Sequence, residues 1–256
     1  MVNGVWREPG QLADAQLVRE RLVPLRRRLE EVLDGLTDDL ARAPSVLPGW
    51  TRGHVLAHLT GLGSAIARQA EYTRVDERID FYDGGQAGRT ADIEARAGRS
   101  AAVHSREVRT AALRVEAAFA AQTEGTWSRP TGNRGRTVAQ LAESWWRELA
   151  IHLTDLDLGV GYAVWTPDLL DHLADYLAGR VPRGTRLELI PVDGVAGPWD
   201  LGDHAVNPIV LRGTAADLVA WLAGRAPEGS VTTGADGPSG ADGGTEPLPA
   251  LLDQWP

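Results

Sequence analysis

Two segments of this chain carry side chains that could together bind a metal ion. The segment GWTRGHVLAHL contains His54 and His58, and the segment WWRELAIHLTDL contains Glu148 and His152. In each segment the pair is spaced four residues apart, so on a helix both side chains lie on one face, one turn apart. A histidine of the first helix facing the Glu148/His152 pair would complete a His/His/Glu set. Such a set is a catalytic type of zinc site, with a fourth position left for water or substrate.

Each pair taken alone also has a structural interpretation, as a surface ion pair or as a core histidine with one hydrogen bond. The apolar neighbours of the second pair, such as Trp145, Trp146 and Leu149, indicate that its helix is buried. A buried carboxylate needs a cation, a metal or several donors, so one shared metal site is the favoured interpretation. Asp155, one turn after His152, would either orient that histidine or cap the helix end, and the sequence leaves both roles open.

The composition excludes several classes of function. The chain has 256 residues and a formal net charge of −9, which argues against a nucleic-acid partner. No apolar run approaches the roughly 20 residues that a membrane span needs. The N-terminal stretch MVNGVWREPGQLADAQ lacks the basic start and apolar core of a signal peptide. We therefore expect a cytoplasmic protein.

The chain contains neither cysteine nor lysine. The first absence excludes disulfides, thiolate metal sites and cysteine nucleophiles. The second excludes Schiff-base chemistry and a P-loop. An anionic substrate must then be held by arginine, backbone amides or a metal, and the planar arginine fork suits carboxylates. Complete replacement of lysine by arginine is also typical of proteins from high-GC genomes.

The helical spacing of apolar residues predicts four long helices in the first part of the chain, separated by loops at 76–88 and 124–136. We expect these helices over 12–43, 51–75, 89–123 and 137–158. Pro24 kinks or divides the first, Thr51 is a good N-cap for the second, and Thr137 with Gln140 forms a capping box for the fourth. Four such helices predict a four-helix bundle.

The pattern changes after Gly159. We expect helices over 167–179 and 214–224 and strands over 185–192 and 206–212. Pro167 suits a first helical turn, Thr214 an N-cap, and Pro208 an edge strand. The predicted fold class is therefore α+β, with a four-helix bundle over 1–160 and a small α/β domain over 161–256. We expect the Gly-rich segment 229–245 to be flexible, and the tail PLPALLDQWP to dock back onto the protein.

The two histidine-bearing segments resemble the metal-binding helices of the DinB-like superfamily and, more narrowly, of mycothiol-dependent maleylpyruvate isomerases. The resemblance extends to QAGRTADIEARAGRS, TGNRGRTVAQLAESWWRE and GTAADLVAWLAGR, in order, and so covers most of the chain. It implies zinc, or another divalent metal, on His58, Glu148 and His152, and the thiol mycothiol as cofactor. The missing cysteines fit a sulfur that the cofactor brings. Mycothiol belongs to actinobacteria, which fits the absence of lysine.

The resemblance also implies roles for residues outside the ligand set. Arg89, where a loop with a Gly-Gly pair enters the third helix, and Arg225, after the WLAG sequence, would hold the substrate carboxylates. By sequence context alone, Arg89 would be a solvated arginine and Arg225 would be a partner for a helix C-terminus. His54 has a family counterpart that is not a ligand, and we assign it to cofactor binding. The sequence leaves open whether it contacts mycothiol or only packs.

The expected activity is a zinc- and mycothiol-dependent cis-trans isomerisation of maleylpyruvate to fumarylpyruvate by reversible thiolate addition. One alternative uses the same metal site for a different reaction. The protein would then be a mycothiol S-transferase that acts on an electrophile in detoxification or natural-product biosynthesis. A second alternative is a non-catalytic module that binds a metal or small molecule. We expect a monomer or homodimer whose partners are mycothiol and a small dicarboxylate or electrophile, with no nucleic acid and no membrane.

Overall fold

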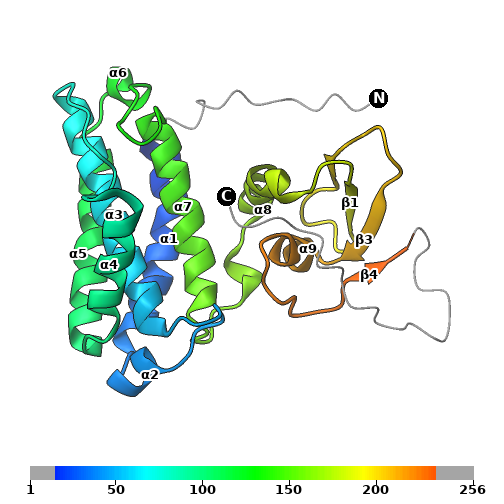
Figure 1. Ribbon diagram of the computed structural model, residues 1–256, viewed down its shortest axis with the longest axis horizontal. Helices are drawn as coiled ribbons and strands as arrows, with labels where there is room; N and C mark the ends of the chain where they lie inside the picture. The colour runs from blue at the N-terminus through cyan, green and yellow to red at the C-terminus, as the bar shows by residue number, and fades with distance from the viewer. Residues whose placement is uncertain (1–14, 235–256) are drawn as a thin grey trace. The chain divides into compact units, whose positions relative to one another are not determined.

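The computed structural model describes residues 15–234 and divides the chain into two compact units, Met1–Val160 and Gly161–Pro256. The described part of the first unit is helical, whereas the second unit combines helices with strands (Figure 1). Within residues 15–234, no helix combines the length and the apolar character that crossing a bilayer would require.

The first unit is a helix bundle built around α3 (Figure 1). Helix α3 packs against α4, α5 and α7, and α1 packs against α5 and α7, so α1, α3, α5 and α7 form the predicted four-helix bundle. The helices of this unit are α1 (Ala15–Asp34), α2 (Asp38–Arg42), α3 (Arg52–Arg74), α4 (Gly85–Ala97), α5 (Ala101–Ala120), α6 (Glu124–Trp127) and α7 (Val138–Asp155).

The starts of α3 and α7 follow the capping signals in the sequence. The Thr51 side chain accepts a hydrogen bond from the His54 backbone N–H, and Thr137 forms the expected capping box with Gln140. These bonds satisfy N–H groups that a helix start leaves without partners. The predicted N-termini of both histidine-bearing helices are confirmed.

Arg52 ties the start of α3 to the end of α7. Its Nε donates to the backbone carbonyl of Leu156 (2.5 Å), and its Nη2 donates to the carbonyl of Asp157 (2.9 Å). The last carbonyls of a helix have no partner within the helix, and a cationic side chain there also suits the helix dipole. The two helices are thereby held at the same end of the bundle.

Glycines let α3 approach its neighbours closely. A Cβ on Gly63 would lie 3.1 Å from the Trp145 ring of α7 and 3.2 Å from the Ala111 Cβ of α5. Trp145 is almost fully buried against this surface. The glycine therefore allows a large aromatic side chain to fill the space between the helices at native packing density.

Two of the predicted long helices are interrupted. The first breaks after Asp34, and the Thr37 side chain caps the separate helix α2, while Pro24 lies inside a continuous α1. The predicted helix 89–123 begins earlier, at Gly85, and is divided into α4 and α5 at residues 98–100, where Gly98 ends one helix and extended Ser100 precedes the next. The expected loop 124–136 contains the short helix α6.

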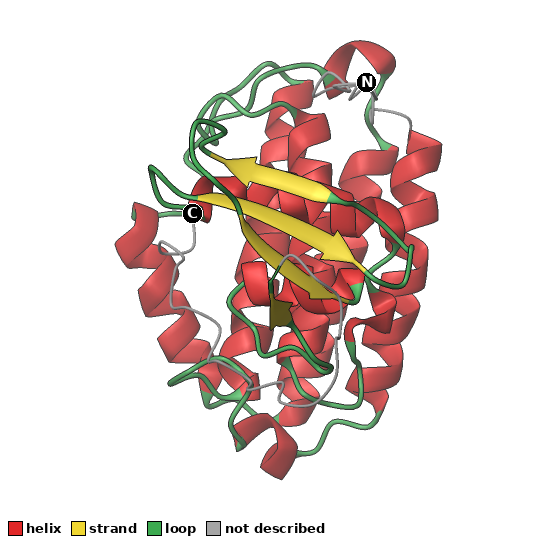
Figure 2. Ribbon diagram, turned by 90° about the vertical axis from the view of Figure 1, so that its right-hand side faces the viewer, coloured by secondary structure: helices red, strands yellow, loops and turns green. Residues whose placement is uncertain are grey.

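The second unit contains a small mixed sheet of order β2-β1-β3-β4, seen face-on in Figure 2. Strands β1 and β3 are parallel, whereas β2 and β4 pair antiparallel with β1 and β3, respectively. Helix α9 packs against β1, β3 and α8. The elements are η1 (Tyr162–Val164), α8 (Pro167–Leu177), η2 (Ala178–Arg180), β1 (Arg186–Pro191), β2 (Trp199–Gly202), β3 (Ile209–Gly213), α9 (Ala215–Leu222) and β4 (Thr232–Thr233).

The expected elements of this unit are present, with Pro167 in the first turn of α8 and Thr214 as the N-cap of α9. The edge assignment for the second strand was wrong, because β3 lies between β1 and β4. Pro208 precedes the first residue of β3, so no ladder N–H is lost. Of the segment 229–245, the described part contributes β4, and the rest, like the C-terminal tail, lies outside the described residues.

Substituting Gly53 by alanine should destabilise the bundle. A Cβ at this position would lie 2.1 Å from the backbone carbonyl oxygen of Ala97, which a rotamer change cannot relieve. We expect a loss of about 3 kcal/mol of unfolding free energy, at the upper end of overpacking costs. Urea unfolding followed by helical circular dichroism measures it.

The matched control is Gly61→Ala in the same helix, where the nearest atom is a side-chain oxygen of Asp92 at an ordinary 3.5 Å. Helix propensity should make this variant neutral or slightly more stable. Equal unfolding midpoints for both variants would contradict the close packing of α3 against the end of α4.

Candidate metal centre

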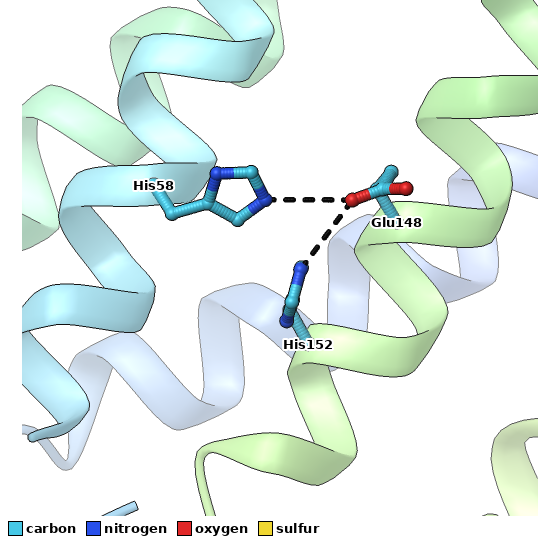
Figure 3. A group of neighbouring side chains, drawn as sticks. All are labelled: His58, Glu148 and His152. Atoms are coloured by element: carbon cyan, nitrogen blue, oxygen red, sulfur yellow. Dashed lines mark hydrogen bonds and ion pairs between the residues drawn. The ribbon is translucent and has the colours of Figure 1, made fainter. Parts of the chain in front are cut away.

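The structure brings His58, Glu148 and His152 together (Figure 3), with one ligand atom from each lying within 4.8 Å of the others. His58 comes from α3, and the other two come from successive turns of α7. The Glu148 Oε2 lies 3.4 Å from the Nε2 of each histidine. The i, i+4 spacing on α7 and the packing of α3 against α7 thus point three donor groups at one spot.

The carboxylate of Glu148 is largely shielded, with 17% of its side chain exposed. Burial by itself raises the pKa of a carboxyl group. Here the hydrogen bonds from His152 and His58 and the charges of His152 and Arg147 outweigh burial and hold the pKa of Glu148 well below its usual range. Glu148 is therefore an anionic donor at neutral pH.

The two histidines have opposite protonation tendencies in the metal-free protein. Burial lowers the pKa of His58 to about 4, although the hydrogen bond to Glu148 opposes this. Burial also acts to lower the pKa of His152, but the hydrogen bonds to Asp155 and Glu148 outweigh it and raise that pKa to about 8. At pH 7 His58 is neutral, whereas His152 carries a second ring proton, which a bound metal would have to displace.

Asp155 orients His152. Its side chain is fully buried, and its Oδ2 lies 2.8 Å from the Nδ1 of His152. A carboxylate can only accept, so Nδ1 carries the proton and Nε2 is the nitrogen turned toward Glu148. This contact is the one expected for the first of the two roles that the sequence left open, that of orienting His152.

A pocket of about 380 Å³ opens beside His58. Arg89 lies in it, with its Nη2 3.0 Å from the Nδ1 of His58. The chain reaches Arg89 through Gly84 and Gly85, whose φ angles of 74° and 63° are left-handed values that glycine adopts readily. The Gly-Gly pair noted in the sequence thus sets the path by which α4 brings this arginine to the pocket.

The other two predicted site residues have different surroundings. The ring of His54 caps its own helix, with Nδ1 accepting from the Thr51 backbone N–H (3.1 Å), and it stacks on Trp50 at 6.0 Å. Arg225 belongs to the second unit and follows α9, where its Nη1 donates to the carbonyl of Ala223 (2.6 Å). Their roles toward cofactor and substrate stay predictions.

Sequence reasoning missed two side chains at this site. Tyr82 lines the pocket, and the guanidinium carbon of Arg89 lies over its ring, 6.0 Å from the ring centre. Arg147 is almost fully buried, with Nη2 3.5 Å from the Oε1 of Glu148. The available signals were an aromatic pair, Phe81 and Tyr82, in a polar loop and an arginine directly before Glu148 on a helix rich in buried apolar residues.

Comparison with known proteins agrees with this architecture. No curated protein matches the chain in sequence. A crystal structure of the mycothiol-dependent maleylpyruvate isomerase superposes with a TM-score of 0.74 at 21% identity, covering 84% of this chain and 92% of that one. A mutant of that isomerase gives 0.73 at 20% identity, with the same coverage. These matches show a shared fold.

The family model described as the mycothiol maleylpyruvate isomerase N-terminal domain matches residues 22–157. This match covers more than half of the chain, and the protein therefore belongs to this family.

Proposed function

We propose that the protein is a metal- and mycothiol-dependent enzyme that converts maleylpyruvate to fumarylpyruvate. The observation that carries this proposal is the His58/Glu148/His152 cluster opening beside a pocket that contains Arg89. Membership of the family and the fold shared with the isomerase structures support it.

Two of the distances in the cluster match those of a tetrahedral metal site. Zinc bonds to nitrogen and oxygen are about 2.0–2.1 Å long, so neighbouring ligand atoms of a tetrahedron lie about 3.3–3.4 Å apart. Both imidazole nitrogens lie 3.4 Å from the Glu148 oxygen, which is longer than a good hydrogen bond. His58, Glu148 and His152 would hold zinc or another divalent ion with a fourth position open. When bound, the ion would lower the pKa of a thiol so that thiolate is available at neutral pH.

The remaining parts of the reaction require a sulfur nucleophile and groups that bind the substrate. The chain has no cysteine, so the nucleophilic sulfur is that of mycothiol, with His54 on the thiol side. When bound, mycothiol would supply a thiolate whose reversible addition to the cis double bond permits rotation to the trans isomer. Arg89 and Arg225 bind the substrate carboxylates and stabilise the enolate charge.

The first test is the decay of maleylpyruvate absorbance with the purified, zinc-loaded protein, with and without mycothiol, while the thiol concentration is followed. Isomerisation yields fumarylpyruvate and leaves the thiol concentration unchanged. Loss of one thiol per product would show a mycothiol S-transferase instead. Bound metal without any thiol-dependent turnover would favour a binding module and overturn the proposed reaction.

Replacing a ligand should abolish both metal binding and turnover. Glu148→Gln retains the shape of the side chain but removes the charge that faces two imidazoles and Arg147. We expect zinc affinity to fall by more than the 10–100-fold typical of residues that only support a ligand. Metal content after dialysis measures this. A variant that keeps one zinc per chain would contradict the assignment of Glu148 as a ligand.

Asp155→Asn should weaken the metal centre without emptying it. An amide can still contact the His152 Nδ1, but it no longer fixes which nitrogen carries the proton. We expect zinc affinity to drop about 10–100-fold, measured by competition with a chromogenic chelator. Asp39→Asn is the control, because the Asp39 side chain is 99% exposed. Equal affinities in both variants would remove Asp155 from the site.

Zinc affinity should rise with pH between pH 6 and pH 8. The pKa of His152 is about 8 in the metal-free protein, so below that pH zinc must displace its proton. Proton competition gives about a tenfold gain in affinity for each pH unit. The pKa of His58, about 4, lies too low to contribute in this range. Isothermal titration in buffers of different ionisation enthalpy should show about one proton released per zinc at pH 7, and release of none would contradict the prediction.

A further inference from the structure

On the ring edge away from Glu148, one proposed ligand histidine contacts a hydrogen-bond acceptor and the other contacts a donor. The Nδ1 of His152 lies 2.8 Å from the Asp155 carboxylate, which can only accept a hydrogen bond. The Nδ1 of His58 lies 3.0 Å from Nη2 of Arg89, and a guanidinium can only donate. The same ring position is therefore a donor in one histidine and an acceptor in the other.

This contrast fixes the position of the ring protons. His152 holds a proton on Nδ1, the arrangement that a ligand bound through Nε2 requires. Neutral His58 has its lone pair on Nδ1, so its proton sits on Nε2, which points at the Glu148 Oε2 3.4 Å away. In this tautomer Nε2 has no lone pair to give to a metal. Arg89 thus holds His58 in the form that does not ligate.

We infer that metal binding and anion binding are coupled through the tautomer of His58. Ligation through Nε2 requires the ring to lose its proton there and to gain one, from water, at Nδ1, with no net change in charge. Two donors, Nδ1–H and the guanidinium, would then face each other across 3.0 Å. The contact breaks, and Arg89 is released to bind a carboxylate in the pocket. This inference rests on the metal site of the proposed function.

The surroundings of Arg89 explain why its new partner is a ligand. Two other arginines line the same pocket, and both already have carboxylates: Arg68 is bidentate to Asp83 at 2.8 and 2.9 Å, and Arg96 bonds Asp92 at 2.7 Å. In the described part of the chain, Arg89 forms no such ion pair and contacts His58 and Tyr82. A carboxylate from outside is thus the partner that the released guanidinium lacks.

The coupling works in both directions. If a metal makes Arg89 available and so strengthens carboxylate binding, the carboxylate must strengthen metal binding by the same factor. A substrate that carries a carboxylate would then bind best to the metal-loaded protein. Conversely, the metal is held most tightly while that substrate is present.

The tautomer itself can be observed by 15N NMR of the imidazole rings. The chain has six histidines, which single His→Gln variants assign. We expect the His58 proton on Nε2 in the metal-free protein and on Nδ1 after zinc is added, while His152 keeps a proton on Nδ1 throughout. A metal-free His58 already protonated on Nδ1 would overturn the inference while leaving the metal site intact.

The coupling is measured as zinc affinity in chelator-buffered zinc, with and without maleate and in the absence of mycothiol. We expect maleate to tighten zinc binding at least about fivefold, the lower end of typical couplings. Arg89→Met should abolish this effect. Arg114→Met, which removes a partly exposed arginine paired with Glu71, should retain it.

The outcomes separate this inference from the proposed function. Tightening by maleate that persists in Arg89→Met would mean direct ligation of the metal by maleate and would overturn the coupling, as would zinc binding that maleate does not affect. A protein that binds no zinc under any of these conditions would remove both the coupling and the metal-dependent enzyme. None of these readouts depends on turnover.

Discussion

The carboxylate of Glu148 is the constraint around which the first unit is arranged. A buried negative charge is costly unless cations or hydrogen-bond donors compensate it. Two imidazoles and the Arg147 guanidinium converge on it from helices α3 and α7. The capping of both helices and the Arg52 bonds between them hold these donors in position. The same arrangement that satisfies the charge is the one that suits a divalent ion.

Much of this centre could be predicted from local sequence patterns. The spacing of Glu148 and His152 fixes their relative position as soon as a helix is assumed, and Thr51, Thr137 and Gln140 mark where the helices begin. What spacing alone could not supply was the choice between His54 and His58. That choice came from the family resemblance, and in the structure the His54 ring caps its helix while His58 faces Glu148.

The features that were missed depend on backbone geometry or on contacts distant in sequence. The break between α4 and α5 falls in an alanine-rich stretch whose apolar spacing continues across Gly98 and Ser100, so periodicity alone could not locate it. Strands β2 and β4 are too short for an alternating pattern to stand out. The approach of Arg89 to His58 depends on left-handed backbone angles at Gly84 and Gly85, which composition does not specify.

The proposed metal ligands His58 and Glu148 lie on different helices, 90 residues apart in sequence. An unfolded chain therefore has no preformed site, and a bound ion would be a ligand of the folded bundle alone. Its binding free energy adds to the free energy of unfolding, by about 2.7 kcal/mol when free metal exceeds its dissociation constant a hundredfold. The thermal stability of this bundle would thus depend on metal supply, and a cell short of the ion would lose folded protein as well as loaded sites.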